Sequence, residues 1–127
     1  IKTNETPYMH DFKEIYEFSK LDNADKLDEC EMYHYPNVMR KVLEEFMRFK
    51  VKKSNPTLED ITNVKIALCG TVNCCSKDDI QISTLLGTCN ILSHKSRRTP
   101  DQILKSAQYL MKKIKESDIT HYSTMTN

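Results

Sequence analysis

Apolar residues recur every three or four positions along five stretches of this chain, which is the spacing of one buried face on an α-helix. In the second stretch that face consists of Val38, Met39, Val42, Leu43, Phe46 and Phe49. Helix-start signals precede the stretches: threonine before proline at 6–7 and 99–100, Pro36, and capping-box spacings that begin at Thr57 and Ser76. No segment requires a strand. The sequence therefore predicts an all-α fold, a helical bundle of about five helices with short connections.

The predicted helices span residues 6–20, 36–53, 57–70, 77–93 and a last long stretch from Pro100. Between the first two, the acidic and polar stretch 21–31 lacks apolar periodicity and predicts a loop, which ends in the aromatic cluster Tyr33-His34-Tyr35. After the last helix we expect a tail that contains Asp118, His121 and Tyr122.

The length of 127 residues suits one compact helical domain that covers residues 1–127. Because the chain opens with Ile1 rather than methionine, we expect a fragment of a longer protein. No apolar run approaches the roughly 20 residues that a membrane span needs, which excludes a membrane-spanning protein. Five cysteines at irregular spacing argue against a disulfide framework and favour a reducing, cytoplasmic setting.

Charge is unevenly distributed, although the formal net charge is only +1. Residues 1–36 carry 4 basic and 9 acidic side chains, a net of −5, and residues 37–127 carry 15 basic and 9 acidic side chains, a net of +6. The two parts can attract each other, or a polyanion can dock on the second part. Such asymmetry is by itself usually a solvated surface.

Two pairs of polar residues repeat the spacing of one helical turn. Arg40 and Glu44 lie four residues apart and off the apolar stripe of their helix, and Asn90 and His94 repeat that spacing at the end of a later helix. If the two helices face each other, a guanidinium, a carboxylate, an amide and an imidazole converge. Otherwise Arg40 and Glu44 form an exposed helix ion pair worth about 0.3–0.5 kcal/mol.

This set of groups suits the cleavage of an RNA phosphodiester without a metal ion. The reaction needs a base for the 2′-hydroxyl proton, an acid for the leaving 5′-oxygen and positive charge beside the phosphorus. Histidine titrates near neutral pH, so His94 is the candidate proton carrier, while Arg40 supplies the fixed charge. Glu44 orients one of them or shares the proton transfers. Since only one imidazole is present, the second proton carrier is either Glu44 or the His94 of a second copy in a homo-oligomer.

Three basic residues directly after His94 are candidates for binding RNA phosphates, because guanidinium and ammonium groups both hold phosphate well. They are Lys95, Arg97 and Arg98.

Metal binding is the competing interpretation of this region. Four cysteines that could approach His94 are Cys69, Cys74, Cys75 and Cys89. Their spacing matches none of the usual zinc patterns, so we expect no metal site and buried free cysteines instead.

Three motifs follow one another along the chain: Asn37-x-x-Arg40-x-x-Leu43-Glu44-x-Phe46-x-x-Phe49-Lys50, then Asn90-x-x-Ser93-His94, then Asp118-x-x-His121-Tyr122. With these motifs, in this order from about Tyr8 onward, the chain resembles the C-terminal region of RloC- and PrrC-type anticodon nucleases and of related interrupted-coiled-coil ABC ATPases of bacterial antiphage defence. In that family this region is similar to a HEPN-type helical domain that follows the ATPase. Carried over by position, the resemblance implies a catalytic triad of Arg40, Glu44 and His94, with Asn37, Asn90 and Ser93 in support.

The resemblance implies a ribonuclease that cuts tRNA at the anticodon loop without metal and leaves a 2′,3′-cyclic phosphate. It also implies that the chain is the C-terminal part of a larger ATPase. No cofactor is expected in this segment, because ATP or GTP and Mg²⁺ would bind the upstream ATPase domain, and this sequence has no phosphate-cradling glycine-rich motif. The alternative is a non-catalytic dimerisation or partner-docking module of an ABC-type ATPase, in which the same polar residues form a buried network that fixes helix register.

Overall fold

Helix α5 (Pro100–Ser117) lies at the centre of the structure and contacts each of the five other helices. Its buried face includes Ile103, Leu104, Ala107, Leu110, Met111 and Ile114. Thr99 caps the first turn by accepting a hydrogen bond from the backbone N–H of Gln102 at 3.1 Å. The start of the last long helix and its buried face are therefore confirmed.

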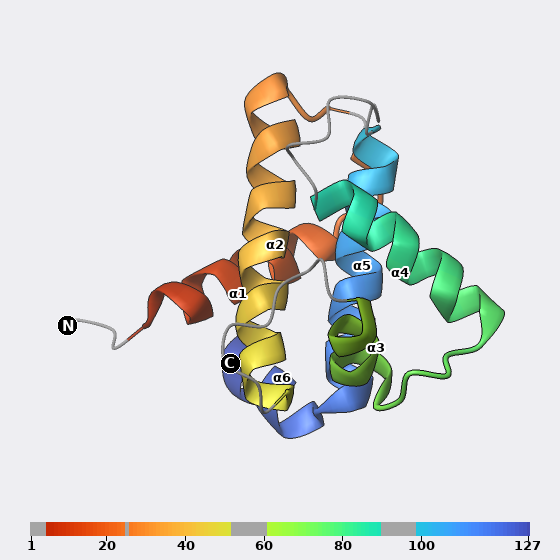
Figure 1. Cartoon of the computed structure of the whole chain (residues 1–127). Helices are drawn as coiled ribbons and strands as arrows, with labels where there is room; N and C mark the ends of the chain where they lie inside the picture. Colours follow the sequence, from red (N-terminus) through yellow and green to blue (C-terminus); the bar gives the residue numbers. More distant parts are fainter. Residues whose placement is uncertain (1–4, 25, 52–60, 90–98) are drawn as a thin grey trace.

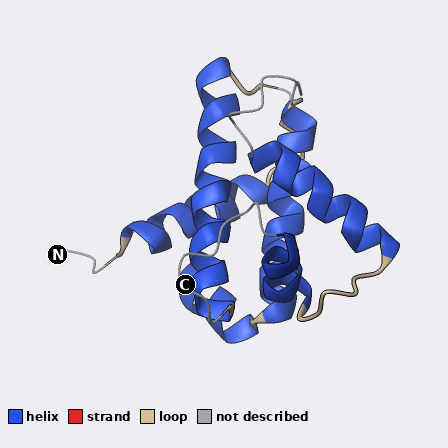
Figure 2. Cartoon of the chain, in the orientation of Figure 1, coloured by secondary structure: helices blue, strands red, loops and turns tan. Residues whose placement is uncertain are grey.

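The computed structural model describes residues 5–24, 26–51, 61–89 and 99–127. The helices around α5 are α1 (Pro7–Ser19), α2 (Glu29–Lys50), α3 (Ile61–Cys69), α4 (Ser76–Cys89) and α6 (Ile119–Thr126), as Figure 1 shows. No strand occurs within these ranges (Figure 2). The predicted all-α class is confirmed as a packed bundle, with six helices in the described residues where about five were expected.

Helix α2 begins at Glu29 rather than at Pro36, so the predicted loop is too long and the cluster Tyr33-His34-Tyr35 is helical. Asp28 and Glu31 form a capping box, with Asp28 Oδ1 accepting from the Glu31 N–H at 2.8 Å and Glu31 Oε1 accepting from the Asp28 N–H at 3.2 Å. Pro36 lies inside the helix and is buried, at a cost of about 3 kcal/mol.

Packing on α1 offsets the cost of the internal proline. The ring of Tyr35, one residue before Pro36, stacks on Phe18 with ring centroids 4.0 Å apart. The seven residues of α2 before the proline, about two turns, are thus held by their cap and by a neighbouring helix. The predicted helix start at Pro36 was wrong because proline favours the first position of a helix. Here the packing of Tyr35 on Phe18 supports helical residues before the proline.

The expected tail is a sixth helix. Asp118 ends α5, where its backbone N–H donates to the Ile114 carbonyl at 2.8 Å, and it caps α6 by accepting from the His121 N–H at 3.0 Å. None of the α6 residues is fully buried, so the segment carries no apolar stripe that sequence periodicity could reveal.

Other boundaries agree with the sequence only in part. Helix α1 matches its prediction, with Thr6 as the cap. The start predicted at Thr57 and the end predicted at residue 93 fall outside the described residues. Phe49, expected on the buried stripe of α2, is 61% exposed. Within the described ranges, no helix is long and apolar enough to cross a membrane.

We predict that Asp28→Ala lowers the free energy of unfolding by about 1 kcal/mol, because the second helix loses its cap. Asp28→Asn is the matched control, since asparagine caps a helix about as well as aspartate. Urea unfolding followed by circular dichroism measures both. Equal losses in the two variants would show that the charge of Asp28, and not its cap, stabilises α2.

Candidate functional site

Asn37, Arg40 and Glu44 lie together on one side of α2, as their helical spacing predicts. The Arg40 Nη2 donates to Asn37 Oδ1 at 2.9 Å, and the Arg40 Nη1 lies 3.8 Å from Glu44 Oε1. The side chains of Arg40 and Glu44 are 39% and 33% exposed, respectively. The amide and the carboxylate thus hold the guanidinium from two sides in a position that solvent still reaches.

Some hydrogen-bond donors of Arg40 have no acceptor among the described residues. A guanidinium has five N–H donors, and the contacts to Asn37 and Glu44 engage two of its nitrogens. Its Nε is buried and has no hydrogen-bond acceptor in the structure as described. A partly exposed guanidinium is suited to hold an anion such as a phosphate through those of its nitrogens that solvent reaches.

The other predicted site residues lie outside the described residues. They are Asn90, Ser93, His94, Lys95, Arg97 and Arg98. The convergence of Arg40 with His94 therefore stays a prediction.

The described end of α4, directly before Asn90, is held close to the centre of the bundle. Helix α4 contacts both α2 and α5, and in Figure 1 its C-terminal end lies toward α2. The Thr88 hydroxyl hydrogen-bonds the Ser106 hydroxyl of α5 at 2.9 Å, and both side chains are buried. The chain thus leaves α4 at a fixed point of the fold.

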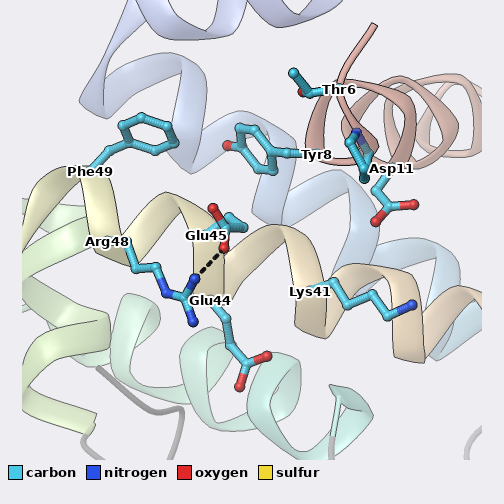
Figure 3. Close-up of a pocket in the computed structure, with 9 residues that line it drawn as sticks. Thr6, Tyr8, Asp11, Lys41, Glu44, Glu45, Arg48 and Phe49 are labelled. Carbon is cyan, nitrogen blue, oxygen red and sulfur yellow. Dashed lines mark hydrogen bonds and ion pairs between the residues drawn. The ribbon is translucent and has the colours of Figure 1, made fainter. Parts of the chain in front are cut away.

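A groove of about 560 Å³ runs between α1 and α2 and shares Glu44 with the Arg40 set. Its lining includes Tyr8, Asp11, Lys41, Glu45, Arg48 and Phe49. In Figure 3, Glu45 lies close to Tyr8, whereas Glu44 points away from Tyr8. The sequence analysis missed this groove, although Lys41, Glu44, Glu45 and Arg48 follow helical spacing on α2.

Tyr8, which lines this groove, contacts His121 of the third sequence motif and so links the first helix to the last. The Tyr8 hydroxyl and the His121 Nε2 are hydrogen-bonded at 2.7 Å. The His121 ring packs against Phe46 and Phe49, with centroids 5.4 and 5.0 Å away. Burial lowers the pKa of His121, and the nearby Asp118 carboxylate opposes that shift. Burial and the charge of Glu45 raise the pKa of Tyr8, which keeps its hydroxyl protonated.

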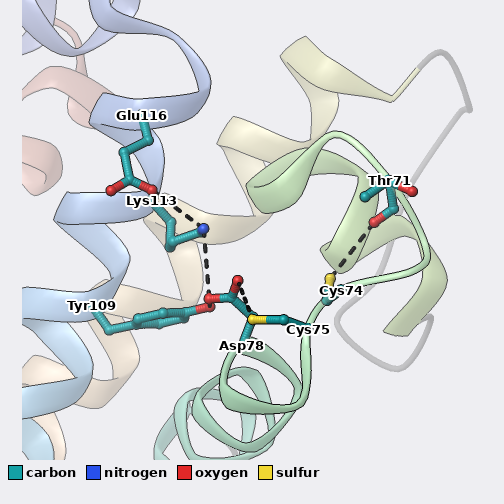
Figure 4. Close-up of polar contacts among 7 residues, drawn as sticks. All are labelled: Thr71, Cys74, Cys75, Asp78, Tyr109, Lys113 and Glu116. Atoms are coloured by element: carbon teal, nitrogen blue, oxygen red, sulfur yellow. Dashed lines mark hydrogen bonds and ion pairs between the residues drawn. The ribbon is translucent and has the colours of Figure 1, made fainter.

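A second polar cluster ties α4 to α5 (Figure 4). Asp78 Oδ1 accepts from the Tyr109 hydroxyl at 2.9 Å, and Asp78 Oδ2 accepts from the Cys75 thiol at 3.4 Å. The Lys113 Nζ lies 3.6 Å from Asp78 Oδ1. The Tyr109 hydrogen bond lowers the pKa of Asp78, and burial raises that of Tyr109. Because these groups satisfy one another, the cluster is structural.

The cysteines are free but less buried than expected. Cys89 is buried, whereas Cys30 and Cys75 are exposed. Burial and the neighbouring Cys74 thiol raise the pKa of Cys69 to about 12, so its thiolate is scarce at neutral pH. Among the residues that the structure describes, no group of three or more His, Cys, Asp or Glu side chains is placed to hold a metal ion.

Comparisons with known proteins give a homologue but no activity. No family model matches the chain, and no solved structure matches it. Two curated relatives, each named "Uncharacterized chromosomal cassette SCCmec type IVc protein CR006", come from Staphylococcus aureus strain MRSA252 and from Staphylococcus aureus, and are 36% identical over 129 residues. The match covers 98% of this chain and 18% of each relative. The chain is therefore a distant homologue of one segment of a much larger protein.

We predict that stability falls as pH is lowered from about 7.5 to 5.5, because His121 has a lowered pKa in the folded chain. Below the ordinary histidine pKa of about 6.5, the unfolded chain binds more protons than the folded chain, so the contribution present above that pH is lost as pH falls. Thermal unfolding across this range measures the effect, and His121→Gln should flatten it. A slope that His121→Gln leaves unchanged would contradict this assignment.

Proposed function

We propose that this chain is a metal-independent RNA endonuclease domain of the anticodon-nuclease type, with tRNA as substrate. The observation that carries the proposal is the Arg40 guanidinium, held by Asn37 and Glu44 while part of it remains exposed. An ordinary exposed ion pair on a helix needs no second partner such as Asn37 and does not need its guanidinium held in one orientation.

In the proposed reaction a base removes the proton of a 2′-hydroxyl, and the 2′-oxygen attacks the adjacent phosphorus. The bond to the 5′-oxygen breaks, and that oxygen takes a proton from an acid, so the products are a 2′,3′-cyclic phosphate and a 5′-hydroxyl. Arg40 stabilises the negative charge that builds up on the phosphoryl oxygens. His94 carries one proton, and Glu44 or the His94 of a second copy carries the other.

The larger protein would supply the rest of the system. The 18% coverage of the relatives supports a multidomain protein, and the resemblance to antiphage-defence ABC ATPases suggests an upstream domain that binds ATP or GTP with Mg²⁺. In this proposal the HEPN-like domain acts in the cytoplasm, where tRNA is available, and nucleotide hydrolysis on the other domain controls cleavage.

The second candidate function is a non-catalytic dimerisation or partner-docking module. Large apolar side chains on the surface support it, in particular Ile80, which is 67% exposed on α4. In that case Arg40, Glu44, Asn90 and His94 form a structural network, and His94→Ala should destabilise the domain by about 1–3 kcal/mol.

We predict that Arg40→Ala and His94→Ala each abolish tRNA cleavage in EDTA while unfolding free energy stays within about 1 kcal/mol of wild type, as for residues off the core. Incubation with total tRNA and mapping of the cut ends measures cleavage. The matched control is Lys105→Ala, which breaks an exposed i,i+4 ion pair with Asp101 on α5, 3.2 Å long, and should leave cleavage unchanged.

The outcomes separate the two functions. Full cleavage by both variants would exclude the ribonuclease role of Arg40 and His94. Loss of folding in His94→Ala, together with a wild-type protein that never cuts RNA, would favour the docking module.

A further inference from the structure

Two cysteine side chains meet at the corner between α3 and α4. Cys69 is the last residue of α3, and Cys74 lies in the loop 70–75 that leads to the start of α4. Their thiols are hydrogen-bonded, and this contact adds to burial in raising the pKa of Cys69. The Cys74 thiol also donates to the carbonyl oxygen of Thr71 at 3.7 Å. The two sulfurs are therefore neighbours in the folded chain.

Packing holds Cys74 in this position. The other residues of the loop 70–75 are exposed, whereas Cys74 is half-buried and packs against the hydrophobic core, as Cys69 does. Gly70 ends α3 with a φ of +75°, in the left-handed region, and its N–H donates to the Ile66 carbonyl at 2.9 Å. Because Cys74 belongs to no helix, the small movement that a sulfur–sulfur bond requires leaves the helices intact.

The next cysteine in the sequence has a different partner. The Cys75 thiol donates to Asp78 Oδ2 at 3.4 Å, and its side chain is exposed. In Figure 4 the sulfur of Cys75 points toward Asp78, whereas the sulfur of Cys74 points toward Thr71. The fold thus places Cys74, and not Cys75, against Cys69.

Two ammonium groups lie near the pair. Lys65, on α3, is close enough to both thiols for their charges to interact, and Lys113, on α5, is that close to Cys69. Positive charge favours the thiolate, which is the form of cysteine that attacks a disulfide, although the Asp78 carboxylate has the opposite effect on Cys69. A hollow of about 290 Å³ beside Cys69 and Lys113 leaves room for a departing small thiol.

We propose that Cys69 and Cys74 form a reversible disulfide by exchange with a low-molecular-weight disulfide. The Cys74 thiol releases its proton to solvent, and its sulfur attacks one sulfur of the small disulfide. A mixed disulfide forms at Cys74, and the first small thiolate leaves and takes up a proton. Cys69 then loses its proton to solvent and attacks the Cys74 sulfur, which expels the second small thiolate. The two cysteines are oxidised, and the small disulfide is reduced to two thiols.

The environment of Cys69 sets the order of these steps. Burial and the Cys74 contact keep Cys69 protonated, so Cys74 attacks first. The mixed disulfide removes the Cys74 charge that opposes ionisation of Cys69, which favours the second step. In a reducing compartment such a disulfide forms transiently, as in redox-sensing proteins. Its formation joins the end of α3 to the loop before α4 and is independent of any RNA cleavage.

Equilibration with mixtures of reduced and oxidised glutathione tests the pair in the full 127-residue chain. Alkylation of the remaining thiols, tryptic digestion and mass spectrometry of the peptide 66–77, which contains both cysteines, measure the internal disulfide. Wild type should form it with an equilibrium constant at least about tenfold higher in native buffer than in concentrated urea, because the fold holds the sulfurs together. An equal or lower constant in native buffer would overturn the proposal.

Two variants form a matched pair for this experiment. Cys75→Ser keeps Cys69 and Cys74, whereas Cys74→Ser keeps Cys69 and a cysteine only one residue further along. In urea the two variants should form an internal disulfide to a similar extent, because their loops have nearly equal length. In native buffer the constant for Cys75→Ser should exceed that for Cys74→Ser by about tenfold or more. Equal native constants would show that the fold does not select Cys74.

The order of attack is tested in a chain that already carries Cys75→Ser. Adding Cys69→Ser should trap the mixed disulfide, so the peptide 66–77 gains one glutathionyl group. Adding Cys74→Ser instead should leave Cys69 largely unmodified after the same exposure to oxidised glutathione. Circular dichroism checks that each variant keeps its helices. Faster modification of Cys69 than of Cys74 would refute Cys74 as the residue that attacks first.

Discussion

The burial of one face of α5 against all five other helices is the interaction on which this fold depends. Apolar burial stabilises by about 25 cal/mol per Å² removed from water, and α5 shares a buried surface with every other described helix. Helices α1 and α2, which also pack on each other, thereby gain a fixed spacing. The groove between them and the polar side of α2 are consequences of that packing.

Helix α2 presents two kinds of chemistry on neighbouring strips of its surface. The strip of Asn37, Arg40 and Glu44 offers a positioned guanidinium. The adjacent strip, with Arg48 and Phe49, lines the groove toward α1. Because Glu44 takes part in both, a ligand in the groove and an anion at Arg40 would be held by the same rigid element, which fixes their separation better than two loops could.

Sequence reasoning succeeded where an apolar stripe and a capping side chain acted within one helix, as for Thr99 and α5. It failed where contacts between residues far apart in the sequence determined the local structure. The ring of Phe18 supports the turn before Pro36, and Tyr8 receives His121 from the far end of the chain. Helical spacing correctly predicted that Arg40 reaches Glu44, but no local pattern could show that Phe49 leaves the core to border a groove. The pairing of Arg40 with His94 depends on residues outside the described structure and stays a prediction.

Asp118 ends one helix and caps the next, and it also lies 3.4 Å from the Lys50 ammonium at the end of α2. Helices α5 and α6 are therefore joined without a spacer, and the direction of α6 is set by a single residue. Inserting one residue at this corner would rotate the last helix by about 100° and carry the imidazole of His121 away from Tyr8. The length of the chain at this corner, more than the composition of α6, decides whether His121 reaches Tyr8 and supports that side chain at the groove.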